Sequence, residues 1–214
     1  TGIGRDRGLS YTDGEIRSRG KDHRVVEETS SFRDAYGLIL DELEQALDRV
    51  DPAQMEVLLD AVLTARRVFV IRVGRVMLSL QAMAKRFNHL GITAFCVGDI
   101  NEPAITERDL LLVGSGSGES VVPVAIARIA KQQGARIAHV GSNPDSSLAP
   151  LVDVFVRVPV DTKLNLPDEM ESEQIMTALF EQCLYILGDS LALMIVRRHQ
   201  LDVQELWQHH ANLE

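Results

Sequence analysis

Hydrophobic residues recur at helical spacing after residue 30 and again near the C-terminus. Between these segments, expected strands alternate with expected helices. Over residues 31–50, apolar positions recur at spacings of three and four, which is typical of one buried helix face. A second helix is expected to follow at once, because Asp51 can cap it and Pro52 would occupy the tolerated first turn. A long helix is expected over 171–198, and its apolar second half indicates deep burial or an oligomer interface.

Between these helices, short runs of β-branched or other apolar residues alternate with helical patterns. The expected strands are 68–71, 92–97, 110–113, 137–140 and 154–158, and the expected helices are 76–90 and 119–133. Continuously apolar strands indicate burial on both faces, and crossover helices between them favour a parallel sheet. The sequence thus predicts an α/β fold, a three-layer α-β-α sandwich with a five-stranded parallel sheet in the flavodoxin-like order 2-1-3-4-5. Ligands of such folds bind beyond the carboxyl ends of the strands.

Residues 1–30 differ from the rest of the chain. They show no apolar periodicity, and their six Lys and Arg balance six Asp and Glu. A segment that cannot bury apolar surface does not fold alone, so we expect an irregular N-terminal arm. Residues 31–214 are then expected to form a single domain, with a polar linker at 159–170 and a polar tail at 202–214.

Composition excludes several classes of protein. The formal net charge is −9, and an acidic chain without a basic stripe is a poor candidate for nucleic-acid binding. Cys96 and Cys183 lie in apolar segments and form no metal or disulfide pattern. No apolar run approaches the roughly 20 residues that would span a membrane, and no signal-peptide core stands at the start. We therefore expect a cytoplasmic protein that binds neither nucleic acid nor membrane.

The segment from Gly114 to Ser120 (GSGSGES) is the strongest candidate for a ligand site. It joins an expected buried strand to an expected helix, where glycines allow close backbone approach and the helix start favours negative charge. Serine hydroxyls add uncharged hydrogen-bond donors. A phosphate site is the sharper interpretation, and a simple turn with serine capping is the alternative.

Together with two further segments, this loop resembles the SIS (sugar isomerase) domain, and within it the 6-phospho-3-hexuloisomerase family. The other two are 179–182 (LFEQ) and 210–214 (HANLE), in the order and at the intervals of that family. The resemblance implies a cytoplasmic, usually tetrameric isomerase without metal or organic cofactor. It would interconvert 3-hexulose 6-phosphate and fructose 6-phosphate, with each site shared between subunits of a dimer or tetramer.

The resemblance also implies a role for particular residues. The substrate phosphate would be held by the hydroxyls and backbone of Ser115, Gly116, Ser117, Gly118 and Ser120. Glu181 matches the glutamate proposed as catalytic base, and His210 matches a C-terminal histidine thought to reach a neighbouring subunit's site.

The chemistry asks for similar groups, since moving a carbonyl through an enediol needs one positioned base and one donor to the oxygens. Apolar neighbours in a helix would strengthen Glu181 as a base. Gln174, seven residues earlier on nearly the same helical face, could orient a substrate hydroxyl. Glu181 could instead be a solvated or ion-paired residue, and His210 part of a frayed terminus. His89 and His139 are expected to be hydrogen-bonded structural histidines.

One loop departs from the family pattern. After the first strand the family usually carries a GAGRSG-like loop, but here the corresponding residues are 72–77 (RVGRVM). Gly74 and Arg75 are retained and remain candidates for substrate binding. Arg72 takes a glycine position, where it would either block the site or provide a new phosphate clamp. The alternative function is therefore a non-catalytic or differently specific phosphosugar-binding SIS protein. A dinucleotide-binding oxidoreductase is disfavoured, because the glycine spacing and strand position do not match.

Overall fold

The computed structural model describes residues 31–213, so the expected arm at 1–30 lies outside the described residues. The helices are α1 (Phe32–Leu47), α2 (Pro52–Thr64), α3 (Val76–His89), α4 (Val121–Gln132) and α5 (Ala178–His199). The strands are β1 (Val68–Ile71), β2 (Ala94–Cys96), β3 (Leu110–Gly114), β4 (Arg136–Gly141) and β5 (Val154–Arg157). Short 3₁₀ turns stand at Ala149–Leu151, Ile175–Thr177 and Glu205–His209. Every expected strand and helix is present, with ends shifted by a few residues except in α5.

The first two helices begin where their capping residues predict. The Ser31 hydroxyl accepts from the Asp34 amide, and the Asp34 carboxylate accepts from the Ser31 amide, which is a complete capping box. The Asp51 carboxylate accepts from the Ala53 amide at 2.8 Å, so it caps α2 as expected.

The sheet has the predicted topology. Its order is β2-β1-β3-β4-β5, and each neighbouring pair is parallel. Ile71 is in register with Val113, and Gly114 with Val140. The carboxyl ends of β1, β3 and β4 therefore meet at one edge, on which the Gly/Ser loop and the Arg72 loop both stand.

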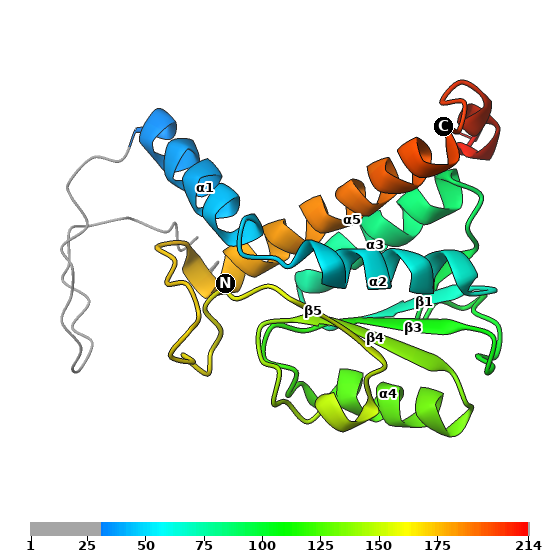
Figure 1. The fold of residues 1–214 in the computed structure, drawn as a ribbon, viewed down its shortest axis with the longest axis horizontal. Coiled ribbons are helices and arrows are strands. Elements are labelled where there is room, and N and C mark those ends of the chain that lie inside the picture. Colours follow the sequence, from blue (N-terminus) through cyan, green and yellow to red (C-terminus); the bar gives the residue numbers. More distant parts are fainter. Residues whose placement is uncertain (1–30, 214) are drawn as a thin grey trace, which may run out of the picture.

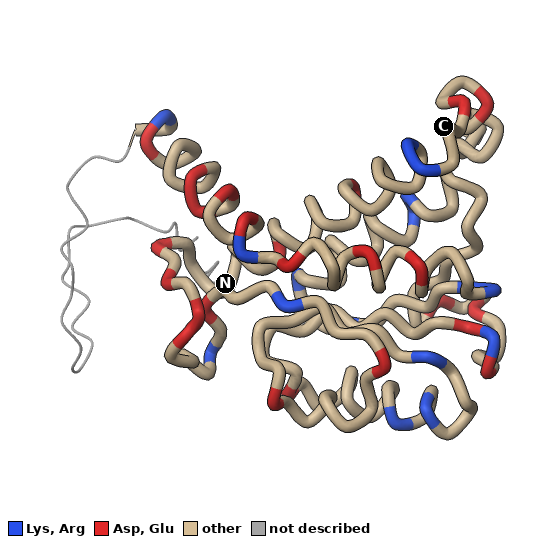
Figure 2. Tube along the Cα trace, viewed as in Figure 1, with Lys and Arg blue, Asp and Glu red and all other residues tan. Residues whose placement is uncertain are grey.

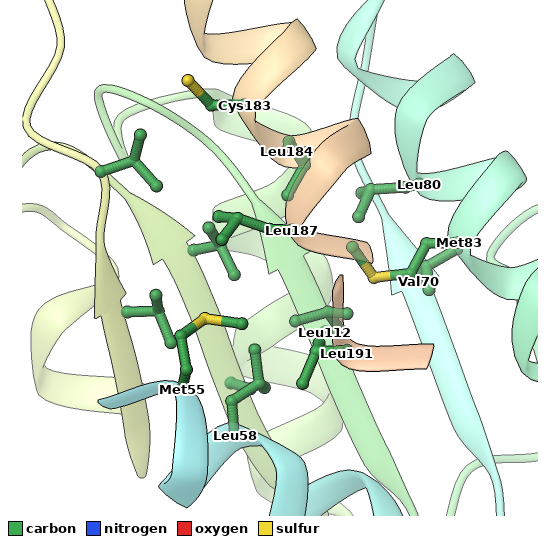
Figure 3. Packing of buried hydrophobic residues seen from close by; sticks show 14 of the residues in the cluster. Met55, Leu58, Val70, Leu80, Met83, Leu112, Cys183, Leu184, Leu187 and Leu191 are labelled. Carbon is green, nitrogen blue, oxygen red and sulfur yellow. The ribbon is translucent and has the colours of Figure 1, made fainter. Parts of the chain in front are cut away.

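Helices cover both faces of the sheet (Figure 1). One face carries α2, α3 and α5, and the other carries α4, which gives the three layers. Figure 3 shows Leu184 and Leu187 of α5 facing Leu80 and Met83 of α3 above the strands. This larger core fixes the N-terminal part of α5 over the sheet.

The long C-terminal helix starts later than expected. Instead of running from Glu171, α5 begins at Ala178, after Met176 and Thr177 adopt left-handed backbone angles (φ 52° and 63°). The reason is a long-range contact: the buried Glu42 carboxylate accepts hydrogen bonds from three groups of the segment before the helix. These are the Ser172 hydroxyl, the Glu173 amide and the Gln174 side-chain amide.

The expectation that no apolar run approaches membrane-spanning length needs correction. The helical stretch Ile175–His199 is long and apolar enough to cross a membrane by length and composition alone. More than half of its most apolar window is buried inside the fold, as in the core helix of a globular domain. Its apolar character is thus explained by packing against α3 and the sheet.

Charge is unevenly distributed over the fold. Figure 2 shows acidic positions along α1 and in the loop between β5 and α5, with few basic ones near them. Within that loop, burial raises the pKa of Asp161, and the nearby carboxylates of Glu169 and Glu42 add to the effect. Because the chain is acidic overall, a site lined by basic residues would indicate a negatively charged ligand.

Candidate functional site

The Gly/Ser loop leaves β3 at Gly114 and enters α4 after Ser120. Its tightest point is Gly118, with φ +66°. A β-carbon there would lie 2.3 Å from the Ser146 hydroxyl oxygen, so only glycine fits. The Ser115 hydroxyl is buried and accepts from the Gly118 amide at 3.1 Å, which closes the loop on itself.

The side chain of His139 on β4 forms a hydrogen bond with the backbone of the Gly/Ser loop. Its side chain is 1% exposed, and its Nε2 lies 2.8 Å from the Ser115 carbonyl oxygen. Burial lowers the pKa of His139 to about 4, the positive charge of Arg72 acts in the same direction, and the bond to Ser115 partly opposes them. The ring is therefore neutral near pH 7, and its Nε2–H donates to the carbonyl. This confirms the expectation of a hydrogen-bonded structural histidine.

Arg72, at the carboxyl end of β1, reaches directly into the loop. Its Nη1 donates to the Ser120 hydroxyl at 2.6 Å and to the Ser115 hydroxyl at 3.2 Å. Ser120 makes no side-chain cap to α4, because its hydroxyl is engaged with the guanidinium instead. Burial lowers the pKa of Arg72, while the negative charge of Glu181 opposes that shift.

A cavity of about 110 Å³ opens between this loop and the start of α5. Of the predicted phosphate ligands, Gly116, Ser117 and Ser120 line it, whereas Ser115 and Gly118 lie behind them in the loop. The other lining residues are Arg72, Val76, Thr162, Lys163, Thr177 and Phe180. A cavity needs only about 10–15 Å³ to hold a water, so the space admits a larger polar group.

Glu181 and Arg75 line a second, neighbouring groove of about 420 Å³ between α1, α3 and α5. Glu181 is 8% exposed, and its Oε2 lies 3.2 Å from Arg75 Nε as an ion pair. Within residues 31–213 that oxygen makes no hydrogen bond, so a lone pair is available to take a proton. Gly74 (φ +71°) forms the turn that places Arg75 at the start of α3.

The two hollows are adjacent along the chain. Phe180 lines the loop cavity and Glu181 the groove, while Val76 lines the cavity and Arg75 the groove. Glu181 was expected in the middle of a helix, but it lies in the first turn of α5 because that helix begins at Ala178. The carboxylate therefore stands near the phosphate loop rather than halfway along the bundle.

Two predicted site residues, Gln174 and His210, line neither the loop cavity nor the groove. Gln174 precedes α5, so it does not share a helical face with Glu181, and its amide donates to Glu42 at 3.0 Å. The C-terminal segment lies beyond the opposite end of α5 (Figure 1). Within it the ring of His210 stacks on His89 at 5.0 Å and contacts Trp207 at 5.1 Å. Glu181 and His199 are eighteen positions apart in α5, roughly 27 Å along the helix.

Sequence reasoning missed Lys163, Thr162 and Thr177 at the cavity. They belong to the irregular connection between β5 and α5, for which periodicity gives no signal. Arg72 was expected either to block the site or to provide a new phosphate clamp, but its contacts with Ser115 and Ser120 were not predicted.

Comparison with known proteins tests the family and the fold. No protein-family model matches the chain. A 3-hexulose-6-phosphate isomerase of Mycobacterium gastri is 40% identical over 177 residues, covering 83% of this chain and 88% of the relative. A 3-hexulose-6-phosphate isomerase of Bacillus subtilis is 33% identical over 176 residues, covering 82% and 95%.

Solved structures share the fold. The crystal structure of a hypothetical protein matches with a TM-score of 0.74 at 30% identity, covering 83% of this chain and 95% of that one. A hypothetical protein of Methanococcus jannaschii, whose structure led to an inferred function of 3-hexulose-6-phosphate isomerase, matches with a TM-score of 0.72 at 24% identity. That match covers 85% of this chain and 99% of the other.

The parallel sheet in the order 2-1-3-4-5, with a Gly/Ser loop after β3 and flanking helices, is the SIS (sugar isomerase) fold, which solved phosphosugar isomerases and a sugar-isomerase-domain transcription factor share. Within that class, the sequence identity to the M. gastri and B. subtilis enzymes shows the family. The chain belongs to the 3-hexulose-6-phosphate isomerase family.

Proposed function

We propose that the protein interconverts 3-hexulose 6-phosphate and fructose 6-phosphate. The observation that carries the proposal is a buried, hydrogen-bond-free carboxylate oxygen of Glu181 beside a Gly/Ser cavity, in a chain 40% identical to an isomerase of that name. The sugar phosphate would lie against Gly116, Ser117 and Ser120, and the carbon chain would extend past Phe180 toward the groove.

In this mechanism Glu181 takes the proton from C2 of the 3-ketose. The electron pair forms the C2–C3 double bond of a cis-enediol, and the same carboxyl returns the proton to C3, while a proton moves from O2 to O3. Arg75, paired with Glu181, is positioned to stabilise negative charge on the enediol oxygens. No net oxidation occurs, and the proton balance closes once a further group carries the proton from O2 to O3.

We assign the transfer of the proton from O2 to O3 to His210 of a neighbouring subunit. Within one chain, His210 and Glu181 lie at opposite ends of α5, which supports a site shared across an oligomer, either a dimer or a tetramer. Exposed apolar side chains support association: Tyr185 of α5 lines the groove, and Phe32 and Leu40 lie on α1, which also lines it. We further propose a cytoplasmic location, as expected for an enzyme of sugar metabolism.

Replacing Glu181 with Gln tests the base assignment. We expect kcat to fall by about 10²- to 10⁴-fold, because the amide cannot accept the proton, with little change in the dissociation constant of fructose 6-phosphate. A matched control is Glu205→Gln, an exposed residue of the tail, which should keep wild-type kcat. Unchanged kcat in Glu181→Gln would show that another group is the base.

The alternative is a non-catalytic or differently specific phosphosugar-binding protein. It is favoured by one observation, that Arg72 fills part of the site by bonding to Ser115 and Ser120. A coupled assay for fructose 6-phosphate formed from the 3-keto isomer discriminates the two. Tight binding of fructose 6-phosphate without turnover would support the alternative.

A further inference from the structure

Arg72 stands where three strands present their carboxyl ends. It follows β1 directly, and its side chain reaches across to Ser115 and Ser120 of the loop that follows β3. These are two of the hydroxyls expected to meet a phosphate, so any anion entering the cavity encounters the guanidinium as well.

The guanidinium of Arg72 feels the negative charge of Glu181 without contacting it. Within residues 31–213 the guanidinium has no carboxylate in ion-pair contact, and its Nε is buried without a hydrogen-bond partner. A half-buried cation and a buried donor without a partner are both costly. A ligand with negative charge would relieve both costs.

The surroundings favour an anion too. Lys163 lines the same cavity from the connection between β5 and α5. Glu119, the acidic residue of the loop, has its carboxylate bound by the Ser147 amide at 2.7 Å and the Ser147 hydroxyl. In a chain of net charge −9, Arg72 and Lys163 place positive charge at the cavity, while Glu119, whose negative charge attracts Lys163, does not line it.

We propose that Arg72 is a substrate-binding residue that supplies the charge for phosphate recognition. In the free protein its guanidinium is held by the Ser115 and Ser120 hydroxyls, and in the complex its donors turn to the phosphate oxygens. The released Ser120 hydroxyl then donates to the same phosphate. This proposal rests on the proposed function only in taking the ligand to be a phosphate ester.

Three substitutions at position 72 test the proposal. Arg72→Gln removes the charge but keeps a polar side chain, Arg72→Lys keeps the charge without the planar fork, and Arg72→Gly empties the position. The matched control is Arg128→Gln, the same change at an exposed position of α4. Thermal melting of each variant verifies the fold.

Two measurements are made on each variant: KM and kcat with fructose 6-phosphate, and the dissociation constant of inorganic phosphate by titration calorimetry. We expect Arg72→Gln and Arg72→Gly to raise KM and the phosphate dissociation constant about 10- to 100-fold, the range for a charge-assisted hydrogen bond. The value of kcat should stay within about threefold, because the phosphate contact is uniform through the reaction. Arg72→Lys should lie between, since an ammonium keeps the charge but lacks the bidentate fork.

The outcomes separate this proposal from the proposed function. If the wild type turns over sugar but Arg72→Gln leaves KM and phosphate affinity unchanged, the role of Arg72 is refuted and the isomerase stands. If the wild type binds phosphate through Arg72 without turnover, Arg72 is confirmed and the isomerase is refuted. Tighter phosphate binding or higher kcat/KM in Arg72→Gly would mean that Arg72 obstructs the site, which overturns the clamp. Should Arg72→Gln not fold, Arg72→Lys decides by the same two measurements.

Discussion

The buried histidine under the phosphate loop makes a quantitative prediction about acid stability. His139 is 1% exposed, and its folded-state pKa is about 4, against about 6.5 for an ordinary histidine. Between these two values the unfolded chain binds a proton that the folded protein excludes. Stability from the neutral ring is therefore fully present above pH 6.5 and is lost as the pH falls toward 4.

The size of the effect follows from the pKa difference. Between pH 7.5 and pH 5, a group that titrates at 6.5 unfolded and at about 4 folded removes about 2 kcal/mol from the free energy of unfolding. This is a large share of the 5–15 kcal/mol that typically stabilises a domain. The loss comes from holding the charged imidazolium in a buried position, because protonating Nδ1 leaves the Nε2–H bond to the Ser115 carbonyl in place.

The perturbation is His139→Gln, compared with wild type by urea denaturation at several pH values from 5 to 7.5. Glutamine does not titrate. We therefore expect the free energy of unfolding of His139→Gln to be about 1 kcal/mol below that of wild type at pH 7.5. Toward pH 5 it should fall by about 2 kcal/mol less than that of wild type. The control is His199→Gln, the same change at the exposed end of α5, which should leave the slope of wild type. Parallel curves for wild type and His139→Gln would refute the reasoning, since His139 would then titrate alike in both states.

Three further predictions concern the loop and the shared site. Ser117→Ala should raise the KM of fructose 6-phosphate about 2- to 10-fold, as expected for one neutral hydrogen bond at the cavity, whereas an unchanged KM would remove this hydroxyl from the site. Gly118→Ala should lower the free energy of unfolding by about 2–4 kcal/mol in urea titrations, because φ is +66° and the new β-carbon meets Ser146. Adding Ser146→Gly should restore the steric part, and no restoration would contradict the clash. Mixing inactive Glu181→Gln and His210→Ala proteins should recover about a quarter of wild-type activity by subunit exchange if each site combines two chains, and none if it does not.

The sequence predicted the fold well because the sheet is specified locally. Most strands are short apolar runs and each crossover helix carries its own periodic stripe, so the elements are specified locally, while the order 2-1-3-4-5 was predicted from the arrangement of flavodoxin-like folds. The capping residues Ser31 and Asp51 likewise act within three positions. Signals of this kind depend only on neighbouring residues, so tertiary contacts leave the elements they specify in place.

The start of α5 could not be predicted, because the determining residue is about 130 positions away. The pattern from Glu171 is compatible with a helix, but the Glu42 carboxylate binds Ser172 and Gln174 and holds the segment in a loop. The positive φ of Met176 and Thr177 then marks the turn into the helix. Tertiary hydrogen bonds overrode local propensity here, and that shift moved Glu181 to the helix start.

The candidate site was predicted in its parts but not in its arrangement. The Gly/Ser loop and Glu181 were predicted as site residues, and in the structure they line adjacent hollows, with Phe180 and Val76 on the side of the loop cavity. This separation gives different kinetic signatures to the two ends of the substrate. Phosphate contacts at the loop persist from ground state to transition state and should appear in KM, whereas proton transfer by Glu181 occurs only in the transition state and should appear in kcat. A variant of Ser117 that changed only kcat, or one of Glu181 that changed only KM, would mean that the sugar lies in the reverse direction, with its reacting carbons at the Gly/Ser loop.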